Sequence, residues 1–162
     1  MAMRLRVLWF GHPGRSPFEN EVETYRQRTC RRWPAEDLPM KPVTRQRSDN
    51  PAAALSKEAA TVLDRHPRGW CLGILDERAR PRTSRQLASA LAELEQSRPG
   101  LTLVIGSDLG LDPSLRRDAQ LHVSLGPLTL PHQLARLVLW EQLYRATDIL
   151  GSGRYHRAGI GS

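Results

Sequence analysis

The sequence has few cysteines and no long apolar run. Cys30 and Cys71 form no Cys-x-x-Cys pair, so no disulfide framework is expected. No segment approaches the roughly 20 apolar residues that span a membrane. The apolar run near the start, residues 7–10, is too short for a secretory signal. We therefore expect a cytoplasmic protein that does not enter a membrane.

Several motifs of common enzyme classes are also missing. The first expected strand is followed by Gly11-His12-Pro13-Gly14, and Pro13 does not suit a dinucleotide-binding GxGxxG turn. Neither the phosphate-binding GxxxxGK[ST] motif nor the hydrolase motif GxSxG occurs. Histidines 12, 66, 122, 132 and 156 lack zinc-ligand spacing with one another and with the cysteines. Hydrolase and zinc-enzyme interpretations thus have little support, and no metal is expected.

Positive charge exceeds negative charge by a wide margin. The chain has 24 basic and 17 acidic residues, which gives a formal net charge of +7. Only Lys41 and Lys57 are lysines. A genome rich in G and C would explain the high share of arginine equally well, but it need not make positive charges exceed negative ones. The net charge therefore favours a polyanionic partner such as nucleic acid.

Strand-like and helix-like segments alternate along the 162 residues, which suit a single domain over residues 1–162. Capping boxes are predicted at Ser16 with Glu19 and at Thr83 with Gln86. Thr44–Asn50 is expected to be a basic loop. The alternation predicts an α/β domain with a largely parallel sheet. Strands are expected at 4–10, 36–43, 70–75, 101–105 and 122–125, and helices at 16–32, 51–65, from 83, 113–118 and 131–150.

Three of the predicted strands end in segments that suit a ligand. Ligands of open α/β sheets bind beyond the carboxyl ends of the strands. Those ends lie at residues 75–77, 105–107 and 125–130. Gly106 would let a ligand approach the backbone closely. The alternative is that Gly106 and Gly110 only shape a turn between a strand and a helix.

Three separated motifs in the C-terminal third give a more specific indication. They are Leu128–His132 (LTLPH), Leu143–Ala146 (LYRA) and Tyr155–Arg157 (YHR). In this order and spacing they resemble the RlmH (YbeA-like) family of the SPOUT class of methyltransferases. Residues 104–111 resemble the IGGxxGL loop of that family, and Leu75–Arg78 resembles its LDER strand end. Lys57-Glu58 stands where the family often has a Lys-Glu pair.

The resemblance implies a fold, a reaction and a cofactor site. The fold would be a SPOUT-type, mainly parallel sheet flanked by helices, with a deep C-terminal trefoil knot. A homodimer would use S-adenosylmethionine to methylate N3 of a pseudouridine in the 23S ribosomal RNA of the large subunit. Apolar side chains and backbone groups would hold the cofactor adenine. The cofactor-binding residues carried over are Leu75, Gly106, Leu125, Gly126, Pro127, Leu128, Thr129 and Leu130.

The resemblance also suggests residues for catalysis and for RNA binding. His132, Arg145, Tyr155 and His156 are the catalytic candidates, because a base or a cation would help to remove the N3 proton. Arg154 and Arg157 are the candidates for contact with RNA phosphates. The less specific alternatives are that His132 caps a helix and that the two arginines are solvated tail charges.

Two departures from the family pattern leave other functions open. Ser107 stands where the family has a second glycine, and the 44–50 loop replaces a lysine-rich one. A side chain at position 107 would crowd the cofactor if that residue needed a positive φ. A non-catalytic, ribosome-binding relative and a small-molecule α/β enzyme with an open sheet are the alternatives. Dimerisation is expected from the broad apolar surface of the last helix, formed by Leu134, Leu137, Val138, Trp140 and Leu143.

Overall fold

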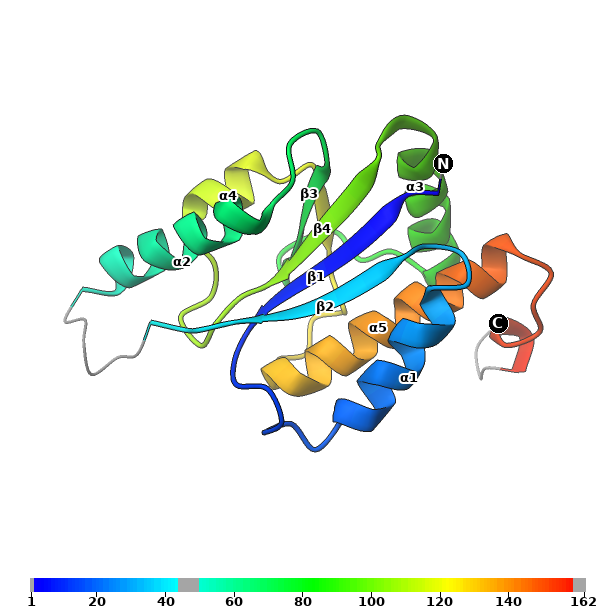
Figure 1. The fold of residues 1–162 in the computed structure, drawn as a ribbon, viewed down its shortest axis with the longest axis horizontal. Helices are drawn as coiled ribbons and strands as arrows, with labels where there is room; N and C mark the ends of the chain where they lie inside the picture. The colour runs from blue at the N-terminus through cyan, green and yellow to red at the C-terminus, as the bar shows by residue number, and fades with distance from the viewer. Residues whose placement is uncertain (1, 44–49, 159–162) are drawn as a thin grey trace.

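A computed structural model describes residues 2–43 and 50–158 and confirms the predicted α/β architecture (Figure 1). The five strands form one sheet in the order β2-β1-β4-β3-β5, and all neighbouring strands are parallel. The strands are β1 (Arg4–Phe10), β2 (Ala35–Met40), β3 (Cys71–Leu75), β4 (Gly100–Ile105) and β5 (Leu121–Val123). The helices are α1 (Glu19–Thr29), α2 (Pro51–Arg65), α3 (Ser84–Ser97), α4 (Pro113–Asp118), α5 (His132–Leu150) and a 3-10 turn, η2 (His156–Ala158).

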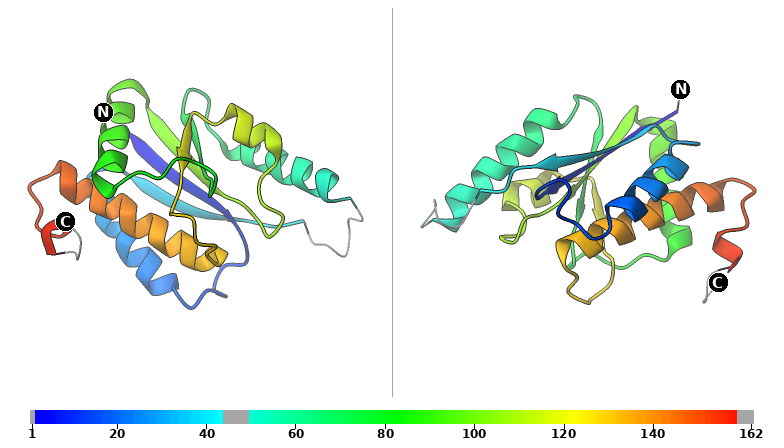
Figure 2. Two further views of the ribbon diagram at one scale, coloured as in Figure 1. Left: turned by 180° about the vertical axis from the view of Figure 1, so that it is seen from behind. Right: turned by 60° about the horizontal axis from the view of Figure 1, so that its bottom comes forward.

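Apolar side chains on both faces of the strands explain the layered arrangement. In β1, Leu5, Val7 and Trp9 belong to one hydrophobic cluster, whereas Leu8 and Phe10 belong to another. This division follows from the alternation of side chains along a strand. Helices α1, α3 and α5 cover the first face, and α2 and α4 cover the second (Figures 1 and 2). The sheet is therefore buried between two helical layers, as parallel sheets require.

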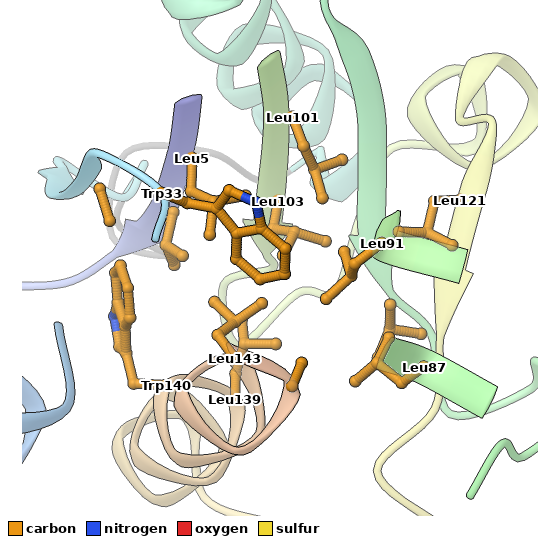
Figure 3. Packing of buried hydrophobic residues seen from close by; sticks show 14 of the residues in the cluster. Leu5, Trp33, Leu87, Leu91, Leu101, Leu103, Leu121, Leu139, Trp140 and Leu143 are labelled. Atoms are coloured by element: carbon orange, nitrogen blue, oxygen red, sulfur yellow. The ribbon is translucent and has the colours of Figure 1, made fainter. Parts of the chain in front are cut away.

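The larger cluster is centred on tryptophan and leucine side chains (Figure 3). Trp33 and Trp140 are fully buried there. The indole N–H of Trp33 donates to Glu95 Oε1 over 2.8 Å, so this buried polar atom is satisfied. Leu139 and Leu143 of α5 face the same cluster. These contacts hold α5 against the sheet and thereby determine where its first residue lies.

The predicted helix starts were right at one position and wrong at another. Thr83 and Gln86 form the expected capping box in front of α3. At α1 the helix begins only at Glu19, and Ser16 Oγ instead accepts the backbone N–H of Phe18 over 3.1 Å. A local serine turn has replaced the helix cap, because serine side chains form both kinds of hydrogen bond.

Pro39 is tolerated in β2 because β2 is an edge strand.

The prediction of a dimer was based on the apolar surface of α5, and the packing of this helix within the chain weakens that argument. The helix packs between α1 and α3 and against the sheet, so its wide apolar surface already has partners within the chain (Figure 2). Trp140 and Leu143 are buried, while Leu134, Leu137 and Val138 remain half-buried. The apolar circumference therefore does not by itself require a second copy.

No helix in the described part of the chain is long and apolar enough to cross a membrane. The loop expected at 44–50 lies, except for Asn50, outside the described residues.

Candidate functional site

A cavity of about 350 Å³ lies where the carboxyl ends of β3, β4 and β5 meet. It falls within the size range of small-molecule sites. The three strand ends singled out in the sequence all contribute to its wall, and the start of α5 closes one side. Its lining includes Leu75, Asp76, Glu77, Gly106, Ser107, Leu125, Gly126, Leu128, Thr129, Leu130 and His132. Pro127, which the resemblance suggested, is not among the lining residues.

Gly106 is required by a tight turn beside the cavity. The N–H of Gly110 donates to the carbonyl oxygen of Ser107 over 2.8 Å, and Gly110 has a φ of +86°. This turn brings the Gly110 backbone over Gly106, where an added Cβ would lie only 2.6 Å from the Gly110 oxygen. The suggestion that these glycines shape a turn is therefore correct. The same turn also forms part of the cavity wall, so the two interpretations do not compete.

Ser107 fits its position without strain. Among the described residues, no residue other than glycine has a positive φ, so the condition under which Ser107 would crowd the cavity is not met. Its hydroxyl donates to Glu58 Oε2 over 2.8 Å, and Glu58 Oε1 accepts the N–H of Val43 over 3.1 Å. Glu58 is 3% exposed. The buried carboxylate thus links α2 to the turn and gives the Lys57-Glu58 pair a structural explanation.

Asp76 joins three elements around the cavity. Its carboxylate accepts the backbone N–H of Arg78 over 3.0 Å, contacts His122 Nδ1 at 3.2 Å, and forms an ion pair with Arg116. Burial opposes the charged form, but these donors outweigh it and hold the pKa of Asp76 below its usual value. Asp76 therefore stays ionised near neutral pH and fixes β5 and α4 relative to the end of β3.

His132 and Leu128 lie at the exposed side of the cavity. His132 is the first residue of α5, and its Nε2 lies 2.8 Å from Asp108 Oδ1. Both side chains are accessible, at 41% for His132 and 84% for Asp108. Leu128 is 75% exposed, which is unusual for a large apolar side chain in this chain. A polar pair and an apolar side chain thus border the opening.

The remaining catalytic candidates gather at the other end of α5. Arg145 Nε donates to Glu141 Oε1 over 3.1 Å, and the same oxygen accepts the Tyr155 hydroxyl over 2.9 Å. His156 Nδ1 lies 3.4 Å from Arg145 Nη1. Because a guanidinium only donates, this nitrogen of His156 accepts, and the neutral ring carries its proton on Nε2. Arg154 and Arg157 are exposed on the same segment.

The tail that carries these residues is held by Asp148. Its carboxylate accepts the N–H groups of Tyr155 and His156 over 3.2 and 2.9 Å. Gly153 allows this approach, because an added Cβ would overlap the Asp148 carboxylate. These bonds hold the start of the YHR motif against the end of α5. Burial, followed by hydrogen bonds with Tyr25 and Glu141, raises the pKa of Tyr155, so its phenol is a donor and not a base.

The structure does not bring all four catalytic candidates together. His132 begins α5 and borders the cavity, whereas Arg145 lies near the other end of α5 and Tyr155 and His156 follow that end. Arg145 follows His132 by thirteen positions, which corresponds to about 20 Å of helix. Within one chain, these two parts of the predicted site cannot act on the same atom.

A buried ionic network was not predicted from the sequence. Arg136 is 2% exposed and forms ion pairs with Glu19 and Asp37. Asp37 also accepts the indole N–H groups of Trp9 and Trp140 over 3.1 and 2.8 Å. Burial lowers the pKa of Arg136, but the two carboxylates more than compensate and raise it. The only signal in the sequence was an arginine on the apolar side of α5, and its partners are about 100 residues away in the chain.

Comparisons with known proteins show the family of this chain. The profile of a family described as "Predicted SPOUT methyltransferase" matches residues 3–156. The chain belongs to this SPOUT methyltransferase family. Membership confirms the predicted enzyme class and S-adenosylmethionine, the methyl donor of SPOUT methyltransferases. It also removes the small-molecule α/β enzyme from the alternatives.

Named relatives match this chain over almost its whole length. A protein of Rhodopseudomonas palustris (strain HaA2) named "Ribosomal RNA large subunit methyltransferase H" is 38% identical over 160 residues, covering 96% of this chain and all of that protein. A protein of the same name from Methylobacterium nodulans is 38% identical and covers 96% and 98%. The predicted resemblance to the RlmH family is thus confirmed. A probable methylase family protein from Haemophilus influenzae has the same fold, with a TM-score of 0.51, 13% identity, and coverage of 95% of this chain and 70% of that one.

Proposed function

We propose that the chain methylates N3 of a pseudouridine in the 23S ribosomal RNA of the large subunit, in the cytoplasm and as a single-domain enzyme. The observation that carries this proposal is the cavity at the three strand ends, because it combines a loop-built apolar wall with the motifs of the family. The names of the relatives support ribosomal RNA as the substrate. The net charge of +7 suits a polyanion.

The residues at the cavity fit the cofactor. Leu75, Leu125 and Leu130 offer apolar surface to a flat ring, and Gly106 keeps the neighbouring backbone accessible. No phosphate-binding loop is needed, because the cofactor carries no phosphate. When bound, S-adenosylmethionine supplies a methyl group attached to a sulfonium. We assign Leu75, Gly106 and residues 125–130 as its binding residues, with Pro127 acting through the shape of the loop.

The task of the remaining residues is to position the uracil ring and to remove its proton. Because N3 carries a proton before it accepts the methyl group, this proton must pass to a base. His156 Nδ1 would take this proton once the Arg145 guanidinium turns from Nδ1 to the ring oxygens, where it would stabilise their negative charge. Tyr155 would hold Glu141 and, through it, Arg145 in place, because its hydroxyl donates to Glu141 Oε1 and its raised pKa keeps the phenol protonated. We assign His132 a catalytic role beside the bound cofactor, because it lines the cavity.

This assignment requires a second copy of the chain. His132 and the Arg145–Tyr155–His156 group lie at opposite ends of α5, so one chain cannot complete the site. In a homodimer, the tail of one subunit could lie over the cavity of the other. The exposed Leu128 at the opening, together with half-buried Leu134 and Val138, would supply apolar contact area for that interface.

We also propose the trefoil knot that the resemblance implies. The segment between β3 and α3 is held against β5, from which residues 124–131 lead to α5: Arg82 Nη1 donates to the His122 carbonyl over 2.6 Å, and the N–H of Asp76 donates to the Val123 carbonyl over 2.8 Å. Threading of residues 124–131 through this segment would form the knot. A circular permutant opened at Arg80 should then refold faster than the parent chain, and equal rates would argue against threading.

The function is tested on ribosomal RNA from a strain that lacks the gene. Mass spectrometry of large-subunit RNA should show the loss of one methylated pseudouridine. Purified protein and S-adenosylmethionine should restore it on isolated large subunits. An unchanged nucleoside profile, together with no methyl transfer to these subunits, would contradict the proposal. S-adenosylmethionine binding without transfer would instead favour the non-catalytic alternative.

The tail should be needed for transfer but not for the cofactor. We expect truncation after Gly153 to leave S-adenosylmethionine affinity within a few fold and to lower methyl transfer by at least about 100-fold, the order of a lost acid–base group. Titration calorimetry and a radiolabel assay measure the two effects. His156→Ala should change the pH profile of transfer if His156 is the base. If the truncated protein were as active as the full chain, these residues would be a solvated tail with no part in methyl transfer.

The subunits should associate at micromolar concentration. Sedimentation velocity should show a dimer, because the site needs groups from both ends of α5. A mixture of two inactive variants, His132→Ala and the chain truncated after Gly153, should regain activity by forming one intact site per mixed dimer. Leu63→Ala, which changes an exposed leucine on α2, is the control for nonspecific effects. A monomer with full activity would contradict the shared site.

A further inference from the structure

One strongly basic segment is not used by the proposed cofactor site or by the tail. Residues 77–85, here called the arginine segment, contain Arg78, Arg80, Arg82 and Arg85 but only one acid, Glu77. All four arginines are exposed. Within the described ranges, the side chains of Arg78, Arg80 and Arg85 form no ion pair, hydrogen bond or aromatic contact. Their charges are thus available to a partner.

The segment is held at both ends. At its start, Asp76 accepts the N–H groups of Arg78 and Ala79, through its carboxylate and its backbone oxygen, over 3.0 and 3.1 Å. In the middle, Arg82 Nη1 donates to the His122 carbonyl of β5 over 2.6 Å. At its end, the Thr83 capping box begins α3. A phosphate group bound here would therefore meet a largely preorganised surface and little ordering cost.

The segment also adjoins the site of methyl transfer. Residues 75–77 line the cofactor cavity, and residues 81–84 line a second cavity of about 300 Å³ that shares Val123, Leu125 and Gly126 with the first. The arginine segment therefore runs between residues that line the two adjoining cavities, at the carboxyl end of β3. An RNA strand that placed a base at the cavity would bring its neighbouring phosphates to this rim.

We propose that the arginine segment binds phosphates of the substrate RNA next to the target nucleotide. Arginine forms two parallel, charge-assisted hydrogen bonds with phosphate oxygens, and such contacts set the register of a nucleic acid without reading its sequence. Arg78, Arg80 and Arg85 make these contacts, while Arg82 holds the segment against β5. The inference rests on the proposed function, because it assumes an RNA substrate, and it adds a second RNA surface to Arg154 and Arg157.

The test compares two triple variants that remove the same amount of charge. R78Q/R80Q/R85Q alters the arginine segment. R65Q/R68Q/R98Q alters three exposed arginines at the end of α2, before β3 and after α3, on the amino edge of the sheet. Binding to large-subunit ribosomal RNA is measured by filter retention at several salt concentrations. S-adenosylmethionine affinity and circular dichroism check that both proteins are folded.

The first variant should bind RNA at least about 10-fold more weakly, and its salt slope should fall by about 0.7–0.9 for each phosphate that it no longer neutralises. The control should stay within about threefold of the parent chain, and both should keep their cofactor affinity. Equal RNA affinity of the two variants would overturn the inference, as would an R80E variant that binds RNA like R80Q. A parent chain that binds RNA through the segment but transfers no methyl group would contradict the proposed function and not this surface.

Discussion

Gly106→Val is expected to abolish binding of S-adenosylmethionine. The first side-chain carbon would lie 2.6 Å from the Gly110 oxygen and 2.8 Å from its carbonyl carbon, so the turn must move. Because that turn forms the cavity wall beside Leu111 and Ser107, its displacement removes the space for the cofactor. We expect affinity to fall by at least about 100-fold, or about 2.7 kcal/mol, in titration calorimetry.

A second glycine separates this effect from general strain. Gly69 has a φ of +85° and open space around it, and it lies in the turn before β3, at the edge of the sheet opposite the cavity. Gly69→Val should therefore lower stability without altering cofactor affinity. Circular dichroism should stay close to that of the parent chain for both variants. Cofactor affinity retained by folded Gly106→Val would remove the 106–110 turn from the site.

Asp37→Ala is expected to lower the free energy of unfolding more than any of the other single substitutions. The substitution would leave the charge of Arg136 with Glu19 alone and the indole N–H groups of Trp9 and Trp140 without their acceptor. Removing one partner of a buried ion pair typically costs about 3–5 kcal/mol. Urea unfolding, followed by tryptophan fluorescence, should show this decrease in the free energy of unfolding. A loss below about 1 kcal/mol would mean that the network is solvated in solution.

The double substitution tests whether the cost comes from the uncompensated charge. Asp37→Leu combined with Arg136→Met removes both ions and retains apolar volume. We expect it to be less destabilising than Asp37→Ala alone, because no buried charge is left without a partner. The coupling free energy follows from the cycle with each single variant. Arg6→Met, which disrupts the half-exposed Arg6–Glu36 pair, should cost no more than about 1 kcal/mol and is the matched control.

Periodicity and capping identified most of the elements because both are local properties. The run Leu101–Ile105 gave β4 to within one residue, and Thr83 with Gln86 gave the start of α3. The prediction at Ser16 failed because a serine hydroxyl serves a helix cap and a local turn equally well, and here it accepts the N–H of Phe18 in a turn. The edge position of β2, which makes Pro39 acceptable, could not be read from its own residues.

The cavity that we propose for the cofactor was also predictable from the sequence. Parallel strands bring their carboxyl ends to one edge, so three strand ends converge whenever the strands are neighbours. The motifs of residues 75–78, 104–111 and 128–132 mark those ends in this chain. Their family resemblance then supplied the cofactor, which the residues alone would not have named, because backbone and apolar contacts leave no distinctive polar signature.

By itself, the sequence thus determined the family, the order of strands and helices, and the three segments that form the cavity. Only the tertiary structure decided how the polar groups are grouped. It joined Ser107 to Glu58, surrounded Arg136 with Asp37 and Glu19, and placed His132 away from Arg145, Tyr155 and His156. The physical reason is that secondary structure depends on neighbours in the chain, whereas a polar side chain is satisfied by whichever partner the packing of helices and sheet brings within hydrogen-bonding distance.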